Sequence, residues 1–274
     1  MSVSQKSTID SNSVVIRFLS CDRYTLLQLY LTQLVSKSSD ASSLQLLDAT
    51  GENWTFEGLA ESVDIEQFNH LKILDQIWQE LQPHAKEWWE LLDIAQRDAF
   101  ELPAVPGIEE FSRLIFIANH LENHLAKNNS SHLIIILPAG LNGIKLFEMA
   151  QLGPIVIEDL LEPILNWWDQ TKKSLVALET LMRFKLPSSA KLRFTDRWRH
   201  KFECIQQITS KRNMHQLITI LDCEGYSYKS ISRRICQYSM HAAMPSQLIL
   251  SDIKSASVLN ACQSINSQWM HVTC

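Results

Sequence analysis

Glycine is scarce in this chain: there are seven among 274 residues, and the first is Gly51. A protein that cradles a nucleotide phosphate between a strand and a helix needs glycines there. Only backbone without side chains lets several N–H groups close on the phosphate oxygens. A strand–helix–strand pattern is already complete before Gly51. The sequence therefore excludes a glycine-rich phosphate loop from its first strand–helix connection.

Long apolar runs are also missing. No stretch reaches the roughly 20 apolar residues that a membrane-spanning helix needs. Residues 1–13 are polar and serine-rich, without the apolar segment of a secretory signal. We expect these residues to form a disordered tail, and we expect a cytoplasmic protein with no transmembrane segment.

Cysteine pairs at metal-binding or redox spacing are absent. None of the six cysteines belongs to a C-x-x-C pair, so zinc and thioredoxin-like chemistry have no support, and we predict no metal site. Cys21 falls at an expected helix start, where a thiol pKa can be lowered. The neighbouring Asp22 opposes this effect, so a buried, unreactive thiol is the favoured interpretation.

Charge is distributed unevenly along the chain. From Lys172 to Arg234 there are 14 Lys and Arg against 5 Asp and Glu, a net charge of +9, so the remainder carries −14 of the total of −5. The basic region either balances an acidic region within the fold or a homodimer, or meets an acidic partner. Basic and aromatic residues interleave from Lys191 to Lys201, but amphipathic helices often show this pattern, and we expect no nucleic acid partner.

Short apolar runs alternate with helical periodicity along most of the chain. The clearest strands are expected at residues 14–19, 43–47, 133–137, 216–221 and 247–250, with a weaker strand near 61–65. Near-continuous apolar strands are typical of parallel sheets that are buried on both faces. The fold class we predict is therefore α/β, with a mostly parallel sheet of about five strands flanked by helices.

Helical patterns dominate the middle of the chain. They are expected at residues 24–35, 65–99 with an interruption near Pro83, 108–125, 158–184, 195–208 and 228–241. We predict a single domain over residues 14–252, with helical inserts around 65–126 and 158–210, and a tail at 253–274. In the helix at 108–125, His120 and His124 flank Glu122 and are expected to lie on the solvated face rather than to bind zinc.

Four segments, in this order, resemble the ArsA-like family of arsenite-pump and tail-anchored-protein-targeting ATPases, a deviant P-loop group. The most specific match is Pro106-Gly107-Ile108-Glu109-Glu110, which is similar to a helix start of that family. The others are the helix from Leu71 to Pro83, the strand 133–137 with the loop from Pro138 to Gly143, and the strand from Ile218 to Glu224. The resemblance covers residues 14 to 250 and implies a P-loop NTPase-like fold with a helix-rich middle lobe.

The sequence also departs from the family pattern at the nucleotide site. The family's glycine-rich loop, with its lysines, falls at Leu19–Thr25, where nothing matches. The degenerate nucleotide-site positions that the resemblance implies are Ser20, Cys21, Asp22, Arg23, Asp48, Thr50, Gly140, Asn142 and Gly143. Among them, only Asp48 or Thr50 could replace the family's first-switch acid. We name no catalytic residue and expect no cofactor.

The resemblance therefore implies a family member that has lost its phosphate loop and serves as an interaction, regulatory or assembly factor. Its partner would be an intact family ATPase or a second copy of the chain, and an apolar client segment could lie against the helix at 158–184. The alternative is an active ATP hydrolase that binds ATP and Mg²⁺ in a non-standard way.

Overall fold

The computed structural model describes residues 16–37, 44–52, 54–56, 58–59, 63–91, 107–126, 132–156, 159, 162–175, 186, 189, 195–211, 214–239 and 247–251. The tails predicted at 1–13 and 253–274 lie outside these residues. The helical pattern predicted beyond Leu91 and beyond residue 175 also lies outside them.

Six parallel strands form one sheet in the order β3-β2-β4-β1-β5-β6. The predicted α/β class is confirmed, and the weak strand predicted near 61–65 is a sixth strand. The strand bounds are β1 Ile16–Cys21, β2 Leu44–Asp48, β3 Asp64–Gln67, β4 His132–Leu137, β5 His215–Asp222 and β6 Gln247–Ser251.

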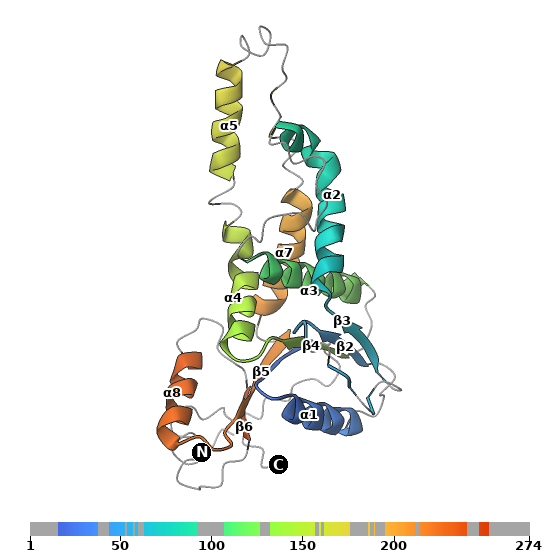
Figure 1. Cartoon of the computed structure of the whole chain (residues 1–274), viewed down its shortest axis with the longest axis vertical. Coiled ribbons are helices and arrows are strands. Elements are labelled where there is room, and N and C mark those ends of the chain that lie inside the picture. Colours follow the sequence, from blue (N-terminus) through green and yellow to red (C-terminus); the bar gives the residue numbers. More distant parts are fainter. Residues whose placement is uncertain are drawn as a thin grey trace, which may run out of the picture.

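Helices cover both faces of the sheet (Figure 1). Helix α1 packs on one face through Leu27 and Leu31, and buried residues of α2, α3, α4, α7 and α8 join the core on the other face. The helix bounds are α1 Tyr24–Lys37, α2 His70–Leu91, α3 Ile108–Ala126, α4 Leu141–Val156, α5 Glu162–Ser174, α7 Thr195–Ser210 and α8 Tyr228–Ser239.

The helix-rich middle lobe projects away from the sheet. Figure 1 shows α5 and the far end of α2 beyond the layer that α3, α4 and α7 form on the sheet. Helix α5 begins at Glu162, so Pro163 lies in its first turn, where proline is tolerated because its missing N–H would have no intrahelical acceptor. Helix α2 continues through Pro83, so the interruption predicted there is wrong.

Sequence periodicity did not reveal α4. Its apolar residues are spread around the helix: some, such as Ile144 and Phe147, are buried against the sheet and α7, while others, such as Leu152, are exposed. The loop predicted from Pro138 to Gly143 is therefore shorter than expected, since Asn142 and Gly143 already belong to α4.

Gly143 allows α4 to approach the sheet closely. A Cβ atom at this position would lie 2.3 Å from the Pro138 carbonyl oxygen and 3.1 Å from the Leu137 Cβ. The first contact is with backbone, which cannot move aside without displacing the β4–α4 connection. A glycine within a helix is thus explained by packing rather than by backbone conformation.

We predict that Gly143→Ala destabilises the protein by about 1–3 kcal/mol through overpacking. Helix propensity alone predicts the opposite, a gain of about 1 kcal/mol. Urea denaturation measures the change in the free energy of unfolding. The control is Lys145→Ala, at an exposed position of the same helix, which should remain within about 0.5 kcal/mol of the wild type. A more stable Gly143→Ala protein would contradict the packing seen here.

Candidate functional site

The direction of the chain reverses around β1. The chain leaves β1 across the α1 face toward β2, whereas it leaves β4 and β5 across the opposite face. In open α/β sheets, ligands bind outside the carboxyl ends of the strands at such a reversal. The candidate site is therefore the carboxyl edge of β2, β4, β1 and β5, and every degenerate nucleotide-site position named above lies along it.

The connection between β1 and α1 is too short to form a P-loop. β1 ends at Cys21 and α1 begins at Tyr24, so only Asp22 and Arg23 join them. A P-loop needs eight residues there, from its first glycine to its Ser or Thr. The Asp22 N–H donates to the Ile220 carbonyl oxygen at 3.2 Å and is therefore already used within the sheet.

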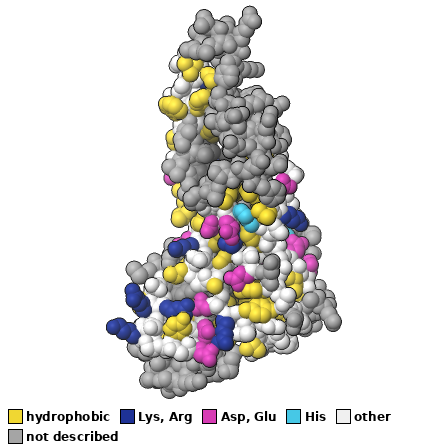
Figure 2. All heavy atoms as spheres, viewed as in Figure 1, with side chains coloured by type: hydrophobic (Ala, Val, Ile, Leu, Met, Phe, Trp, Pro, Cys, Tyr) yellow, Lys and Arg dark blue, Asp and Glu magenta, His cyan; other side chains and the backbone are white. Residues whose placement is uncertain are grey.

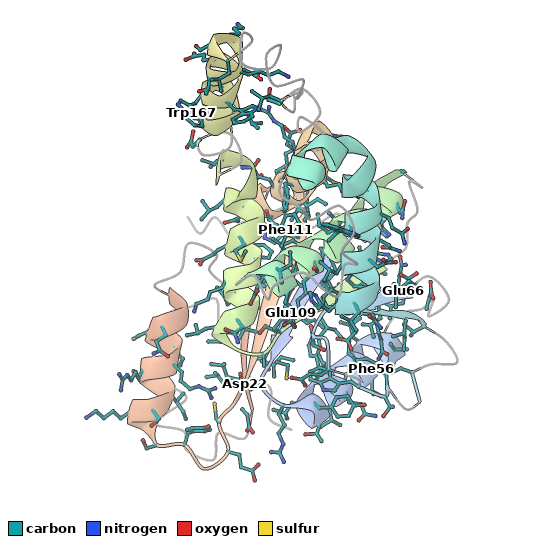
Figure 3. The ribbon with its side chains drawn as sticks, turned by 45° about the horizontal axis from the view of Figure 1, so that its top comes forward. Asp22, Phe56, Glu66, Glu109, Phe111 and Trp167 are labelled. Carbon is teal, nitrogen blue, oxygen red and sulfur yellow. The ribbon has the colours of Figure 1, made fainter. Side chains whose placement is uncertain are left out.

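An ion-pair cluster fills the edge where β1 meets β5. Arg234 of α8 donates to the Asp22 carboxylate at 2.8 Å and to the Asp222 carbonyl oxygen at 3.3 Å. Arg23 contacts Glu224 at 2.5 Å and Asp222 at 3.5 Å. Figure 3 labels Asp22 at the start of this connection, and Figure 2 shows acidic and basic side chains together in this part of the surface.

The balance of charge in this ion-pair cluster disfavours an anion. The cluster consists of Asp22, Arg23, Asp222, Glu224 and Arg234. Three carboxylates face two guanidinium groups, and the most buried of the three, Asp22, follows directly after β1. Burial raises the pKa of Asp22, while Arg234 acts in the opposite direction. The pairs hold α1, β5 and α8 together, and they leave no excess positive charge for a phosphate.

Cys21 is a structural thiol. Its side chain is buried, and its Sγ donates to the Arg23 carbonyl oxygen at 3.1 Å. Burial raises the pKa of Cys21 to about 12, with Asp22 among the further causes. Since the thiolate is the reactive form, Cys21 is unreactive near neutral pH, and the interpretation drawn from the sequence is confirmed.

Ser20 joins β1 to the loop after β4. Its hydroxyl is buried and donates to the carbonyl oxygens of Pro138 at 3.1 Å and Gly140 at 3.4 Å. Gly140 has a φ of +62°, which favours glycine at the start of α4. A Cβ on Gly143 would approach Ser20 Oγ to 3.0 Å, so this corner is closely packed, while Asn142 is exposed beside it.

Asp48 and Thr50 form a separate group at the end of β2. Asp48 is buried, and its Oδ1 accepts hydrogen bonds from the Thr50 N–H at 3.0 Å and hydroxyl at 2.6 Å. Arg113 of α3 donates to the Thr50 carbonyl oxygen at 3.0 Å and also pairs with Glu109. Burial raises the pKa of Asp48. The carboxylate closes a turn, and its geometry is that of a structural residue.

The histidine pair of α3 is not solvated as the sequence predicted. His124 is buried, and His120 is largely covered, with its Nε2 2.8 Å from Glu66 of β3. The error arose because α3 is enclosed on more than one side, by the sheet, α2 and α7. Within the described part of the chain, no three His, Cys, Asp or Glu side chains gather to form a metal site.

Sequence reasoning missed the two arginines that organise the edge. Arg234 lies 212 residues from Asp22, and Arg113 lies 63 residues from Thr50. In the sequence, the run Asp222-Cys223-Glu224 contributed only to the family resemblance. In the structure, the carboxylates of Asp222 and Glu224 pair with Arg23.

Comparison with known proteins adds no identification. No protein-family model matches this chain, and no curated protein matches it. None of the described helices is long and apolar enough to cross a membrane.

We predict that Arg234→Ala lowers the free energy of unfolding by about 1–3 kcal/mol at pH 7, because the mostly buried Asp22 carboxylate loses its partner. Because the pKa of Asp22 is raised in the folded protein, this group stabilises the fold at low pH, and that stabilisation is lost as the pH rises through the folded pKa. Protonation of Asp22 also removes its ion pair with Arg234, so the substitution should cost less free energy of unfolding when the pH is lowered from 7 to about 4.

Urea denaturation at both pH values measures this difference. Arg233→Ala, an exposed neighbour on α8, is the matched control and should remain within about 0.5 kcal/mol of the wild type. An equal loss at both pH values would mean that Arg234 stabilises α8 by packing alone.

Proposed function

We propose that this chain is a degenerate member of the ArsA-like ATPase family that has lost its phosphate-binding loop. It would act in the cytoplasm as an interaction, regulatory or assembly factor rather than as an ATP hydrolase. The observation that carries the proposal is the two-residue β1–α1 connection with Asp22 bound to Arg234. The order of family-like segments around an α/β sheet supports the family, and the closed edge supports the loss of nucleotide chemistry.

Magnitudes favour this conclusion over ordinary nucleotide binding. A hydrogen bond from backbone or lysine to a charged phosphate contributes about 1.5–3 kcal/mol. Three or four such bonds contribute roughly 5–10 kcal/mol if they act independently. Micromolar affinity corresponds to about 8 kcal/mol. Their loss is sufficient to remove ATP binding at cellular concentrations, and Asp22 adds repulsion.

Partner binding through the helical lobe is supported by exposed apolar side chains. Met149, Leu152 and Ile155 of α4 are 39–55% exposed and lie three residues apart, on one side of the helix. Trp167 of α5 is 62% exposed and points outward from the helix (Figure 3). Figure 2 shows hydrophobic side chains on the α4 and α5 side of the molecule. Exposed apolar side chains on one side of a molecule are typical of interaction surfaces.

The proposed partner is a protein, either an intact ATPase of the family or a second copy of this chain. An apolar client segment is a further partner that a leucine-, isoleucine- and tryptophan-bearing surface could accept. The basic region from Lys172 to Arg234 would contribute charge toward an acidic partner surface, although two of its arginines, Arg199 and Arg234, pair with Glu203 and Asp22.

Isothermal titration with ATP and Mg²⁺ tests the proposal directly. We expect no saturable binding up to about 1 mM, the weak limit of ordinary affinities. A dissociation constant at or below about 1 µM would overturn the proposal. An intact P-loop ATPase titrated in the same buffer is the positive control.

A phosphate-release assay distinguishes the alternative of a non-standard ATP hydrolase. We expect no release above the protein-free background. Release that persists through purification and disappears in a Thr50→Ala variant would favour the enzyme. Urea denaturation of Thr50→Ala must accompany the assay, because the Thr50 hydroxyl also closes the Asp48 turn.

A further inference from the structure

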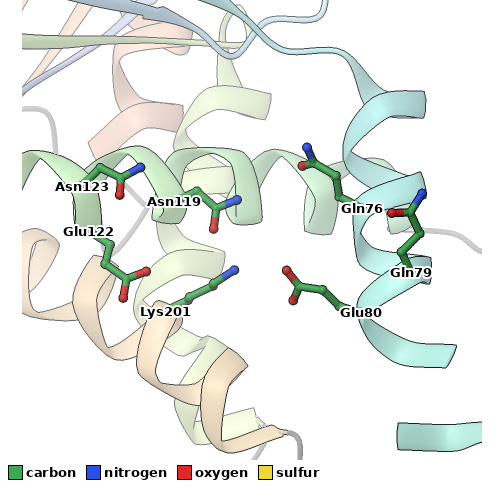
Figure 4. Close-up of a pocket in the computed structure, with 7 residues that line it drawn as sticks. All are labelled: Gln76, Gln79, Glu80, Asn119, Glu122, Asn123 and Lys201. Atoms are coloured by element: carbon green, nitrogen blue, oxygen red, sulfur yellow. The ribbon is translucent and has the colours of Figure 1, made fainter. Parts of the chain in front are cut away.

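A polar cavity of about 560 Å³ lies among α2, α3 and α7, in the helical layer rather than at the carboxyl edge of the sheet. Its size falls in the range of about 300–1,000 Å³ that is typical of small-molecule sites. Figure 4 shows its lining side chains converging from the three helices. The cavity is largely open to solvent, and each of the residues described as lining it is polar or charged.

Four carboxamides supply most of the lining: Gln76 and Gln79 from α2, and Asn119 and Asn123 from α3. Each carboxamide offers both a hydrogen-bond donor and an acceptor. The Gln79 Nε2 donates to Asp75 at 2.7 Å, which fixes the orientation of that amide. Such a lining matches a ligand whose own groups both donate and accept.

The charged residues of the cavity restrict the ligand further. Lys201 of α7 is only 6% exposed, and Figure 4 shows it and Glu80 of α2 pointing toward one another. Glu122 of α3 adds a second carboxylate and lies 3.9 Å from the His200 Nε2. Two carboxylates against one ammonium disfavour an anion, while the buried ammonium disfavours a compact cation.

We propose that this cavity binds a small neutral, polyhydroxylated molecule, that is, a sugar or polyol. Each hydroxyl of such a ligand can donate to Glu80, Glu122 or a carboxamide oxygen and can accept from Lys201 or a carboxamide NH₂. The described lining residues are all polar or charged, so a hydrophobic ligand finds no apolar side chain among them to contact. The inference is independent of the proposed loss of nucleotide chemistry, because the cavity shares no residue with the sheet edge.

Saturation-transfer NMR with glucose, trehalose and myo-inositol tests this inference on the full chain. We expect at least one probe to bind with a dissociation constant of about 1 mM or tighter. The double variant Asn119→Ala/Asn123→Ala should weaken that binding by about tenfold or more. Alanine is the better helix former, so the variant should retain α3, which a far-UV circular dichroism melt verifies. Gln207→Ala, exposed on α7 outside the cavity, is the control and should bind like the wild type.

Charge provides a second and independent readout. Glucose 6-phosphate should bind about tenfold or more weakly than glucose, and Glu80→Gln/Glu122→Gln should narrow that difference. The inference is overturned if no neutral probe shows transfer, if the asparagine variant binds as well as the wild type, or if the phosphorylated sugar binds more tightly. Tighter binding of a neutral blocked dipeptide than of every sugar would likewise reject the ligand class.

Discussion

Leucine and isoleucine side chains on both faces of the central strands provide the interaction on which the rest of the structure depends. In β4, Ile134 and Ile136 join the core under α1, while Leu133 and Ile135 join the core on the opposite face. All four are fully buried. A parallel sheet is stable only when both faces are removed from water, so the chain must supply a helical layer to each.

This requirement, together with the right-handed crossover of parallel strands, decides where the connections run. Strands added on the β2 side are reached across the α1 face, and strands added on the β5 side are reached across the other. The reversal between the two directions lies at β1. In open α/β sheets, ligands bind at such a reversal, and in this chain the same place holds Asp22, Arg23 and Arg234 in ion pairs.

The closed edge and the helical lobe have different chemical character. At the edge, side chains of opposite charge contact one another and hold α8 and β5 to the β1–α1 connection. Among the helices away from that edge, α4 and α5 expose Leu152, Ile155 and Trp167, and a polar cavity that is open to solvent lies among α2, α3 and α7. Groups available to a partner or ligand are therefore concentrated away from the sheet edge, which agrees with a protein that works through its surfaces.

Local patterns in the sequence were sufficient to predict the strands and most of the helices. Apolar runs located β1, β4 and β5, and the β3 segment near residue 64 was found despite its exposed residues. Gly107 with Glu109 and Glu110 marked the start of α3, whereas α5 begins at Glu162, four residues after the predicted start at 158. Helix α4 lacks the periodicity that reveals a helix, because its exposed side also carries apolar residues.

The sequence alone determined that no phosphate loop follows the first strand, because a missing glycine is visible without coordinates. It could not determine what replaces that loop. The pairing of Asp22 with Arg234, the burial of His124 and the gathering of carboxamides from α2 and α3 join positions distant in the chain. Propensity and periodicity act over a few neighbouring residues, whereas such contacts exist only once the sheet order has brought distant segments together.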